Sequence, residues 1–174
     1  PAKYRLSLCG KDTRLRNVIE KVTEISDWSS AQNNGSALGI AVVKSYGSYV
    51  AQVAEVEVVD KKITVKKVWC VIDCGQAIDP GGVRAQMEGG IIYGLSAALF
   101  GEITINKGRV AQSNFHNYRI LQAEQAPDIK VVIINSGAEL GGVGEPGLPP
   151  VAPAVGNAIF AAVGTRLRQL PLRL

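Results

Sequence analysis

The sequence has few of the residues that build metal centres and disulfide frameworks. Its 174 residues include one histidine, one methionine and three cysteines, and 6% are aromatic. An odd number of cysteines argues against a disulfide framework. Cys70 and Cys74 lie four residues apart in a strand-like run, about 13 Å along an extended chain, which is too far for a disulfide or a shared metal. We therefore predict no protein-ligated metal and expect the cysteines to be small buried residues.

Long apolar runs, basic patches and nucleotide-binding motifs are also missing. No apolar run reaches the length of a membrane span, so we expect no membrane-spanning segment in this chain. The net charge is +4, and the lysines and arginines are mostly scattered, without interleaved aromatic residues, which argues against nucleic-acid binding. No Gly-x-x-x-x-Gly-Lys-Ser/Thr run occurs, and no Gly-x-Gly-x-x-Gly run directly follows a strand, which disfavours an unrelated phosphate-binding protein.

The apolar periodicity predicts an α+β domain. Runs rich in valine and isoleucine predict strands over residues 37–44, 49–59, 63–73, 101–105, 109–112 and 129–135. Helical spacing and capping residues predict three helices, over residues 12–25, 79–99 and 150–163. This order of elements favours a mixed sheet with helices packed on one side.

The organisation along the chain can be predicted in more detail. Residues 1–32 form a helical lead-in and residues 33–174 the main domain, because residues 32–36 have the composition of a turn or linker. Alternation along the third strand places Ile63, Val65 and Trp69 on one face, opposite Cys70, and buries its later half on both faces. The hairpin that follows the second helix is expected to turn through a three-residue loop, residues 106–108.

Residues 141–150 form a loop with the composition of a binding site. Four glycines and three prolines in ten residues exclude a regular helix or strand interior. Glu145 is the one acidic residue in this loop, and the loop leads to the start of the third predicted helix, where free N–H groups favour an anion. Two interpretations remain open: a site that uses the carboxylate, or a structural turn whose glutamate faces water.

The second predicted helix is unusually rich in glycine. Gly90, Gly94 and Ala98 recur every four residues and make one side of the helix nearly flat. Such a surface permits either tight packing against another backbone or contact with a large flat ligand. His116, the one histidine, lies in a polar segment and is interpreted as a surface or hydrogen-bonding residue rather than a proton-transfer group.

Three segments together resemble one known family. Residues 141–150, Gly-Gly-Val-Gly-Glu-Pro-Gly-Leu-Pro-Pro, resemble the C-terminal active-site segment of the xanthine oxidase family of molybdenum hydroxylases, in particular the large subunits of the isoquinoline 1-oxidoreductase and aldehyde oxidase type. The run Ala-Gln-Met-Glu-Gly-Gly at residues 85–90 is similar to the Gln-x-Glu-Gly cofactor segment of that family. Residues 114–118 are similar to an Asn-Phe-x-x-Tyr stretch that lines the approach to its site.

The resemblance implies roles for particular residues. Glu145 is implied as the general base, in a water-poor niche that would raise its basicity. The implied cofactor contacts are Gln86, Gly89, Gly90, Tyr118, Gly142, Val143 and Gly144. Backbone N–H groups of the glycine loop and the helix starts at Pro80 and Pro150 are suited to hold phosphates of a molybdopterin in its dinucleotide form. The pterin's own sulfurs would hold the molybdenum, so no protein ligand to the metal is implied.

The same resemblance implies a function for a longer parent protein. The chain is expected to be the C-terminal part of a large subunit that oxidises an N-heterocycle or an aldehyde with oxygen from water and is inactive by itself. Expected partners are the upstream part of the same subunit, a 2Fe–2S small subunit that carries the iron–sulfur clusters, and a small-molecule substrate. The location of the parent, bacterial cytoplasm or periplasm, is left open. The alternative is a non-catalytic folding or interaction domain with empty cofactor loops.

Overall fold

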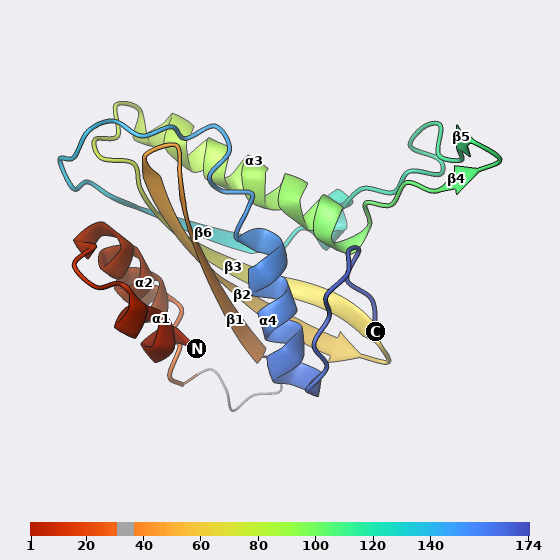
Figure 1. The fold of residues 1–174 in the computed structure, drawn as a ribbon, viewed down its shortest axis with the longest axis horizontal. Coiled ribbons are helices and arrows are strands. Elements are labelled where there is room, and N and C mark those ends of the chain that lie inside the picture. Colours follow the sequence, from red (N-terminus) through yellow and green to blue (C-terminus); the bar gives the residue numbers. More distant parts are fainter. Residues whose placement is uncertain (31–36) are drawn as a thin grey trace.

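The computed structural model describes residues 1–30 and 37–174, so the predicted border at residues 32–36 lies outside the described residues. Its centre is a four-stranded sheet in the order β1-β2-β3-β6 (Figure 1). The first three strands are antiparallel, and β6 runs parallel to β3, so the predicted mixed sheet is confirmed. The strands are β1 (Ala37–Ser45), β2 (Ser48–Val59), β3 (Lys62–Asp73) and β6 (Asp128–Ile134).

In the described residues, four α-helices surround this sheet, and three of them match the predicted ones. Asp12 caps the second helix by accepting a hydrogen bond from the Leu15 backbone N–H, and Asp79 caps the third by accepting one from Gly81. Gly164 ends the last helix in the left-handed conformation, with φ 71°. The short first helix was not predicted. The helices are α1 (Ala2–Leu8), α2 (Thr13–Ile25), α3 (Pro80–Leu99) and α4 (Val151–Val163).

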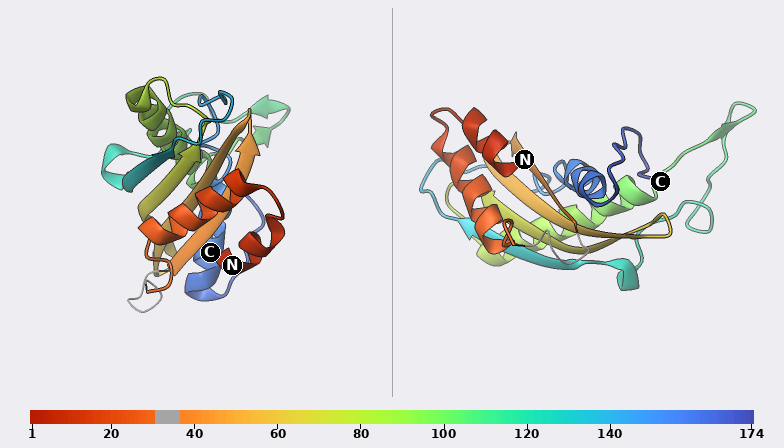
Figure 2. Two further views of the ribbon diagram at one scale, coloured as in Figure 1. Left: turned by 90° about the vertical axis from the view of Figure 1, so that its left-hand side faces the viewer. Right: turned by 90° about the horizontal axis from the view of Figure 1, so that it is seen from below.

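The prediction that all helices pack on one side of the sheet is wrong. The helices α3 and α4 cover one face, and α1 and α2 lie against the other (Figures 1 and 2). Val50 and Ala51 are neighbours in β2 with no exposed surface, and they belong to different cores. Because successive strand residues point to opposite faces, an apolar run in a central strand requires cover on both. The fold class remains α+β.

A β-bulge in β3 changes which residues face which core. Lys67 pairs with Glu55 and Val65 pairs with Val56, so Lys66 has no partner in β2. One extra residue shifts the alternation by one position. Val65 therefore packs in the same core as Cys70, although simple alternation had placed the two on opposite faces.

An arm extends from the C-terminal end of α3, away from the sheet (Figures 1 and 2). It carries the short hairpin of β4 (Ile105–Asn106) and β5 (Arg109–Val110). The predicted three-residue loop is wrong, because Asn106 pairs with Arg109 and only Lys107 and Gly108 form the turn. Both have positive φ, 50° and 76°, as a two-residue hairpin turn requires. The chain returns through the 3₁₀ helix η2 (Ala123–Gln125) to β6.

Two further expectations concern membrane spans and cysteines. None of the helices in the described parts of the chain is long and apolar enough to cross a membrane. Cys9, Cys70 and Cys74 are free and buried, as expected of small core residues. Burial raises the pKa of Cys70 to about 12, even though Gln52 lies within weak hydrogen-bonding distance of its sulfur.

Candidate functional site

The loop of residues 141–150 is held against the ends of three strands. The Gly142 backbone N–H donates to the Tyr46 carbonyl at 2.7 Å, and the Ser48 hydroxyl donates to the Gly142 carbonyl at 2.7 Å. The Gly141 N–H donates to the Cys74 carbonyl at 2.9 Å. A Cβ on Gly141 would collide with the Ser48 side chain. Glycine is therefore required here so that the loop can pack closely against the turn between β1 and β2.

A buried glutamine, Gln52, holds the far end of this loop. Its Nε2 donates to the Gly147 carbonyl at 2.7 Å, and the side chain has no exposed surface. Gly147 also packs against Met87 of α3, since an added Cβ would lie 3.2 Å from Met87 backbone atoms. Sequence reasoning did not single out Gln52. A polar residue on a strand face otherwise lined by valine and alanine is the signal that would have found it.

Glu145 lies between these two anchored points and is exposed. Its Oε2 accepts a hydrogen bond from the Tyr46 hydroxyl at 3.1 Å, across 99 residues of sequence. The hydrogen bond and the carboxylate charge raise the pKa of Tyr46, so the tyrosine stays a protonated donor. The expected water-poor niche is not formed by the described residues, because the Glu145 side chain is exposed.

Gln86, in the second turn of α3, faces the same loop. Its Nε2 donates to the Gly144 carbonyl at 3.3 Å, next to Glu145. A cavity of about 370 Å³ lies between the start of α3 and the loop, and Gln86, Gly141 and Val143 are among its lining residues. Gln86 and the glycine loop, both implied as cofactor contacts, therefore face one cavity. Ile78 and Leu140, both largely exposed, also line this cavity.

The glycines of α3 have two different environments. Gly90 lies against the Gly147–Leu148 peptide, 3.4 Å from an added Cβ, and Gly94 lies against Val151 at the start of α4. These two glycines serve tight packing, one of the two interpretations left open. An added Cβ on Gly89 would meet nothing within 4 Å. Of the predicted cofactor contacts on this helix, Gln86 and Gly89 are the ones that the described chain leaves accessible.

The expected phosphate cradle is largely occupied by the chain itself. The N–H of Gly142 is already bonded to Tyr46, and the Val151 N–H at the start of α4 donates to the Leu148 carbonyl at 3.1 Å. At the start of α3, the Asp79 carboxylate accepts from the Gly81 N–H at 3.0 Å. A carboxylate cap repels a second anion at the same helix end. These groups are therefore not free to bind phosphate oxygens.

Tyr118 does not lie with the other candidate residues. Residues 114–118 belong to the arm beyond the C-terminal end of α3, whereas Gln86 lies near its N-terminal end (Figure 1). Tyr118 lines a separate hollow with Phe115. Residues 114–118, which resemble a stretch lining the approach to the family's site, therefore do not meet the glycine loop, because α3 has 20 residues and separates its two ends by roughly 30 Å.

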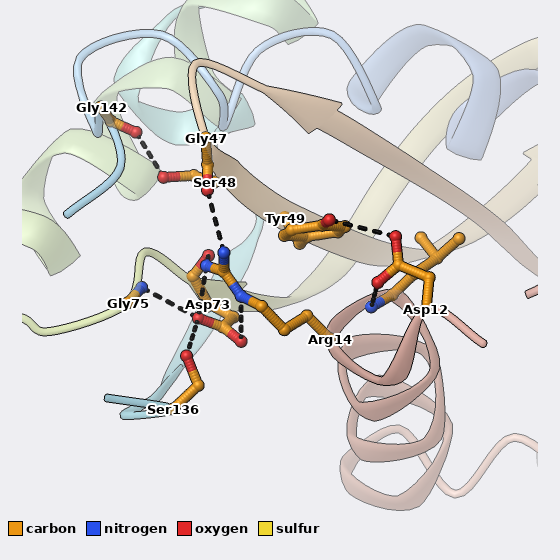
Figure 3. A network of polar contacts seen from close by, with 10 residues as sticks. Asp12, Arg14, Gly47, Ser48, Tyr49, Asp73, Gly75, Ser136 and Gly142 are labelled. Atoms are coloured by element: carbon orange, nitrogen blue, oxygen red, sulfur yellow. Dashed lines mark hydrogen bonds and ion pairs between the residues drawn. The ribbon is translucent and has the colours of Figure 1, made fainter. Parts of the chain in front are cut away.

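A buried ion pair supports the site from the opposite face of the sheet (Figure 3). Arg14 of α2 donates from Nη2 and Nε to the two carboxylate oxygens of Asp73, at 2.8 and 3.0 Å. Gly75 and Ser136 also donate to Asp73, at 2.9 and 2.7 Å. Burial by itself raises the pKa of Asp73, but these hydrogen bonds and the Arg14 charge hold it below its usual value.

This ion pair is connected to the loop through its neighbours. Arg14 also donates to the Gly47 carbonyl at 3.3 Å and lies over the Tyr49 ring, whose hydroxyl donates to Asp12 (Figure 3). Gly47 follows Tyr46 in the turn that carries the Glu145 contact. Gly75 has φ 81°, a conformation that favours glycine. No local pattern in the sequence predicts this network, because Asp73 lies 59 residues from Arg14 and 63 residues from Ser136.

The chain is similar to one family model and to several curated proteins. A family model described as the molybdopterin cofactor-binding domain matches residues 16–127. The isoquinoline 1-oxidoreductase subunit beta of Brevundimonas diminuta is 39% identical over 99% of this chain and 23% of its own length. A membrane-bound aldehyde dehydrogenase of Gluconacetobacter polyoxogenes, whose name specifies pyrroloquinoline quinone, is 32% identical over 99% of this chain and 25% of its own length.

A solved structure shows the same fold. The aldehyde oxidoreductase from Desulfovibrio desulfuricans ATCC 27774 matches with a TM-score of 0.61 and 32% identity, over 71% of this chain and 14% of that chain. The chain spans about a quarter of the length of the two curated relatives above. Within the residues that the structure describes, no three histidine, cysteine, aspartate or glutamate side chains are grouped to hold a metal ion.

Proposed function

Because the chain belongs to the molybdopterin cofactor-binding domain family, we propose that it is the part of a molybdenum hydroxylase that contacts the pterin and carries the base. The reaction is the oxidation of an N-heterocycle or an aldehyde with oxygen from water. The substrate classes are those named by the relatives, an isoquinoline oxidoreductase and aldehyde-oxidising enzymes.

One observation carries this proposal. Gln86 and Glu145, 59 residues apart, meet at the same loop, where the Gln86 amide is bonded to the residue before Glu145. A glutamine amide offers both donors and an acceptor, which suits the polar edge of a pterin. A carboxylate next to that edge is suited to accept a proton. The residues present therefore fit the cofactor at its polar edge.

The residues of this chain have two tasks: they bind the pterin, and they accept a proton. Gln86 and the loop backbone at Val143 and Gly144 orient the pterin, and Glu145 receives a proton at its carboxylate. The cofactor, when bound, supplies the two-electron acceptor and the site from which the oxygen is delivered. Gln52 and Ser48 keep the loop in place, so the position of the carboxylate is determined before substrate binds.

Other parts of the parent complete the site. Since Glu145 is exposed and the chain covers 23% of the isoquinoline oxidoreductase subunit, the cover over the carboxylate comes from the remainder of the large subunit. Tyr118, on the arm, contacts that remainder or its cofactor-binding segments. A 2Fe–2S small subunit takes the electrons, and the dinucleotide part of the cofactor is bound outside the described cavity.

The test compares Glu145→Gln with Glu139→Gln in the complete enzyme that carries this chain. Glu139 is an exposed glutamate of the same segment and serves as the matched control. With isoquinoline or benzaldehyde and a dye as electron acceptor, we expect Glu145→Gln to lower turnover by about 10²–10⁴-fold. Molybdenum content, measured by mass spectrometry, and extracted pterin should stay as in the wild type. Normal turnover at full cofactor content would refute the base assignment.

The exposure of Glu145 favours a second candidate function, that of a non-catalytic folding or interaction domain with empty cofactor loops. The same preparations decide between the two. Molybdenum and pterin in stoichiometric amounts support the enzyme. Their absence from an otherwise folded complete protein, or the presence of pyrroloquinoline quinone in their place, would contradict it.

A further inference from the structure

The turn between β1 and β2 carries an unexpected residue. Ser45 pairs with Ser48, so Tyr46 and Gly47 alone make the turn, with φ of 51° and 77°. A two-residue turn with both φ positive strongly favours asparagine, aspartate or glycine. A bulky residue at positive φ is a conformational outlier. Tyrosine at the first turn position is therefore not explained by the local backbone.

Burial does not explain the tyrosine either. Its side chain is 68% exposed, so it contributes little to either core. Its polar end, in contrast, makes a specific long-range contact: the hydroxyl donates to Oε2 of Glu145 at 3.1 Å. A strained residue that persists without a packing reason is a candidate for a functional role.

The backbone of the same residue fixes the geometry of this contact. The Tyr46 carbonyl accepts from Gly142, three residues before Glu145, at 2.7 Å. Gly142 also lies close to the Tyr46 side chain, since an added Cβ would be 2.9 Å from the tyrosine Cβ. The turn and the loop are thus held together at Tyr46 and Gly142, and this contact sets where the hydroxyl meets the carboxylate.

We propose that Tyr46 is a positioning residue for Glu145: its hydroxyl holds Oε2 and leaves Oε1 as the oxygen that receives the proton. This inference rests on the proposed function of Glu145 as a base. In the described part of the chain, no hydrogen bond involves Oε1. An exposed carboxylate without this contact would rotate among several rotamers, and only some would place an oxygen toward the reacting group.

The kinetic test is Tyr46→Phe in the complete enzyme, with Tyr93→Phe as the matched control. Tyr93 on α3 is 71% exposed, and its replacement makes the same chemical change. We expect Tyr46→Phe to lower kcat by about tenfold, with KM, cofactor content and the unfolding temperature as in Tyr93→Phe. Tyr46→Asn, which suits the turn but has a shorter side chain, should lose kcat to the same extent. Retention of kcat in either variant would overturn the proposal.

A second readout does not depend on the cofactor. The 174-residue chain contains five tyrosines, and the difference between ultraviolet titrations of wild type and Tyr46→Phe reports the ionisation of Tyr46. Its pKa should lie above 10, the usual value, and Glu145→Gln should lower it. A Tyr46 pKa that does not respond to Glu145→Gln would show that the contact is absent, whatever the kinetics. If Glu145→Gln remains active in the complete enzyme, the proposed function fails; if only Tyr46→Phe remains active, this inference alone fails.

Discussion

Replacing Asp73 with asparagine should strongly destabilise the fold. The carboxylate has no exposed surface and accepts four side-chain or backbone hydrogen bonds within 3.0 Å, two of them from Arg14. Asparagine keeps one acceptor oxygen, but its NH₂ group must then face an Arg14 N–H or another donor. Arg14 also loses its counter-charge.

The size of the effect follows from the burial of the pair. Removing one partner of a buried ion pair costs about 3–5 kcal/mol. The Arg14 side chain is 23% exposed and keeps some contact with water, so we expect the lower end, about 3 kcal/mol. For a domain of this size, that lowers the unfolding temperature by roughly 6–12 °C. Asp128→Asn is the matched control, because Asp128 forms an exposed pair with Lys67 at 2.7 Å and such pairs contribute about 0–1 kcal/mol.

The pH dependence gives an independent check of the same reasoning. The pKa of Asp73 is lower in the folded chain than its usual value of 3.8, so its stabilisation is complete above that value and is lost as the pH falls through the lower, folded-state pKa. The difference in unfolding free energy between wild type and Asp73→Asn should therefore shrink below about pH 3.8. Urea unfolding followed by circular dichroism measures it. Equal stability of Asp73→Asn and Asp128→Asn at pH 7 would refute the argument.

Three other outcomes follow from the packing and the site. Gly39→Ala should prevent stable folding, because an added Cβ collides with the backbone of α4. Gly156→Ala, where nothing lies within 4 Å of the added Cβ, should stabilise the helix by about 1 kcal/mol. Thermal unfolding of the two variants and the wild type measures both effects. Iodoacetamide at pH 8 should leave Cys70 unlabelled in the folded chain, because the thiol is buried and its pKa is about 12, and mass spectrometry should find it labelled after denaturation. Gln86→Leu in the complete enzyme should lower molybdenum and pterin content without changing the unfolding temperature of the protein part by more than a few degrees; unchanged content would remove Gln86 from the cofactor contacts.

Local sequence signals were enough for the three long helices and the four strands of the main sheet. Asp12, Asp79 and Gly164 marked helix ends because capping is decided by a few neighbouring residues. The long strands were recognised for the same reason, since their valine and isoleucine content is local. The glycine–proline loop and the Gln86 segment could be found by their composition and by the family resemblance.

Tertiary structure decided which elements meet. The placement of α2 on the opposite face of the sheet depends on burial of both faces of β2, and the bulge at Lys66 shifts the register of a strand whose alternation looked simple. The sequence did not show which end of α3 faces the loop, and so did not show that Gln86 and Tyr118, both implied as cofactor contacts, line separate hollows.

The contacts that hold the site were also decided by the tertiary structure. Glu145 could be singled out from sequence alone, because it is an isolated acid in a rigid loop. Tyr46, Gln52 and Asp73 could not, because their partners lie 99, 95 and 59 residues away. A hydrogen bond between such distant residues leaves no periodicity in the chain. The sequence by itself determined the base candidate and its loop; only the folded arrangement determined what holds that carboxylate in place and how far it is exposed.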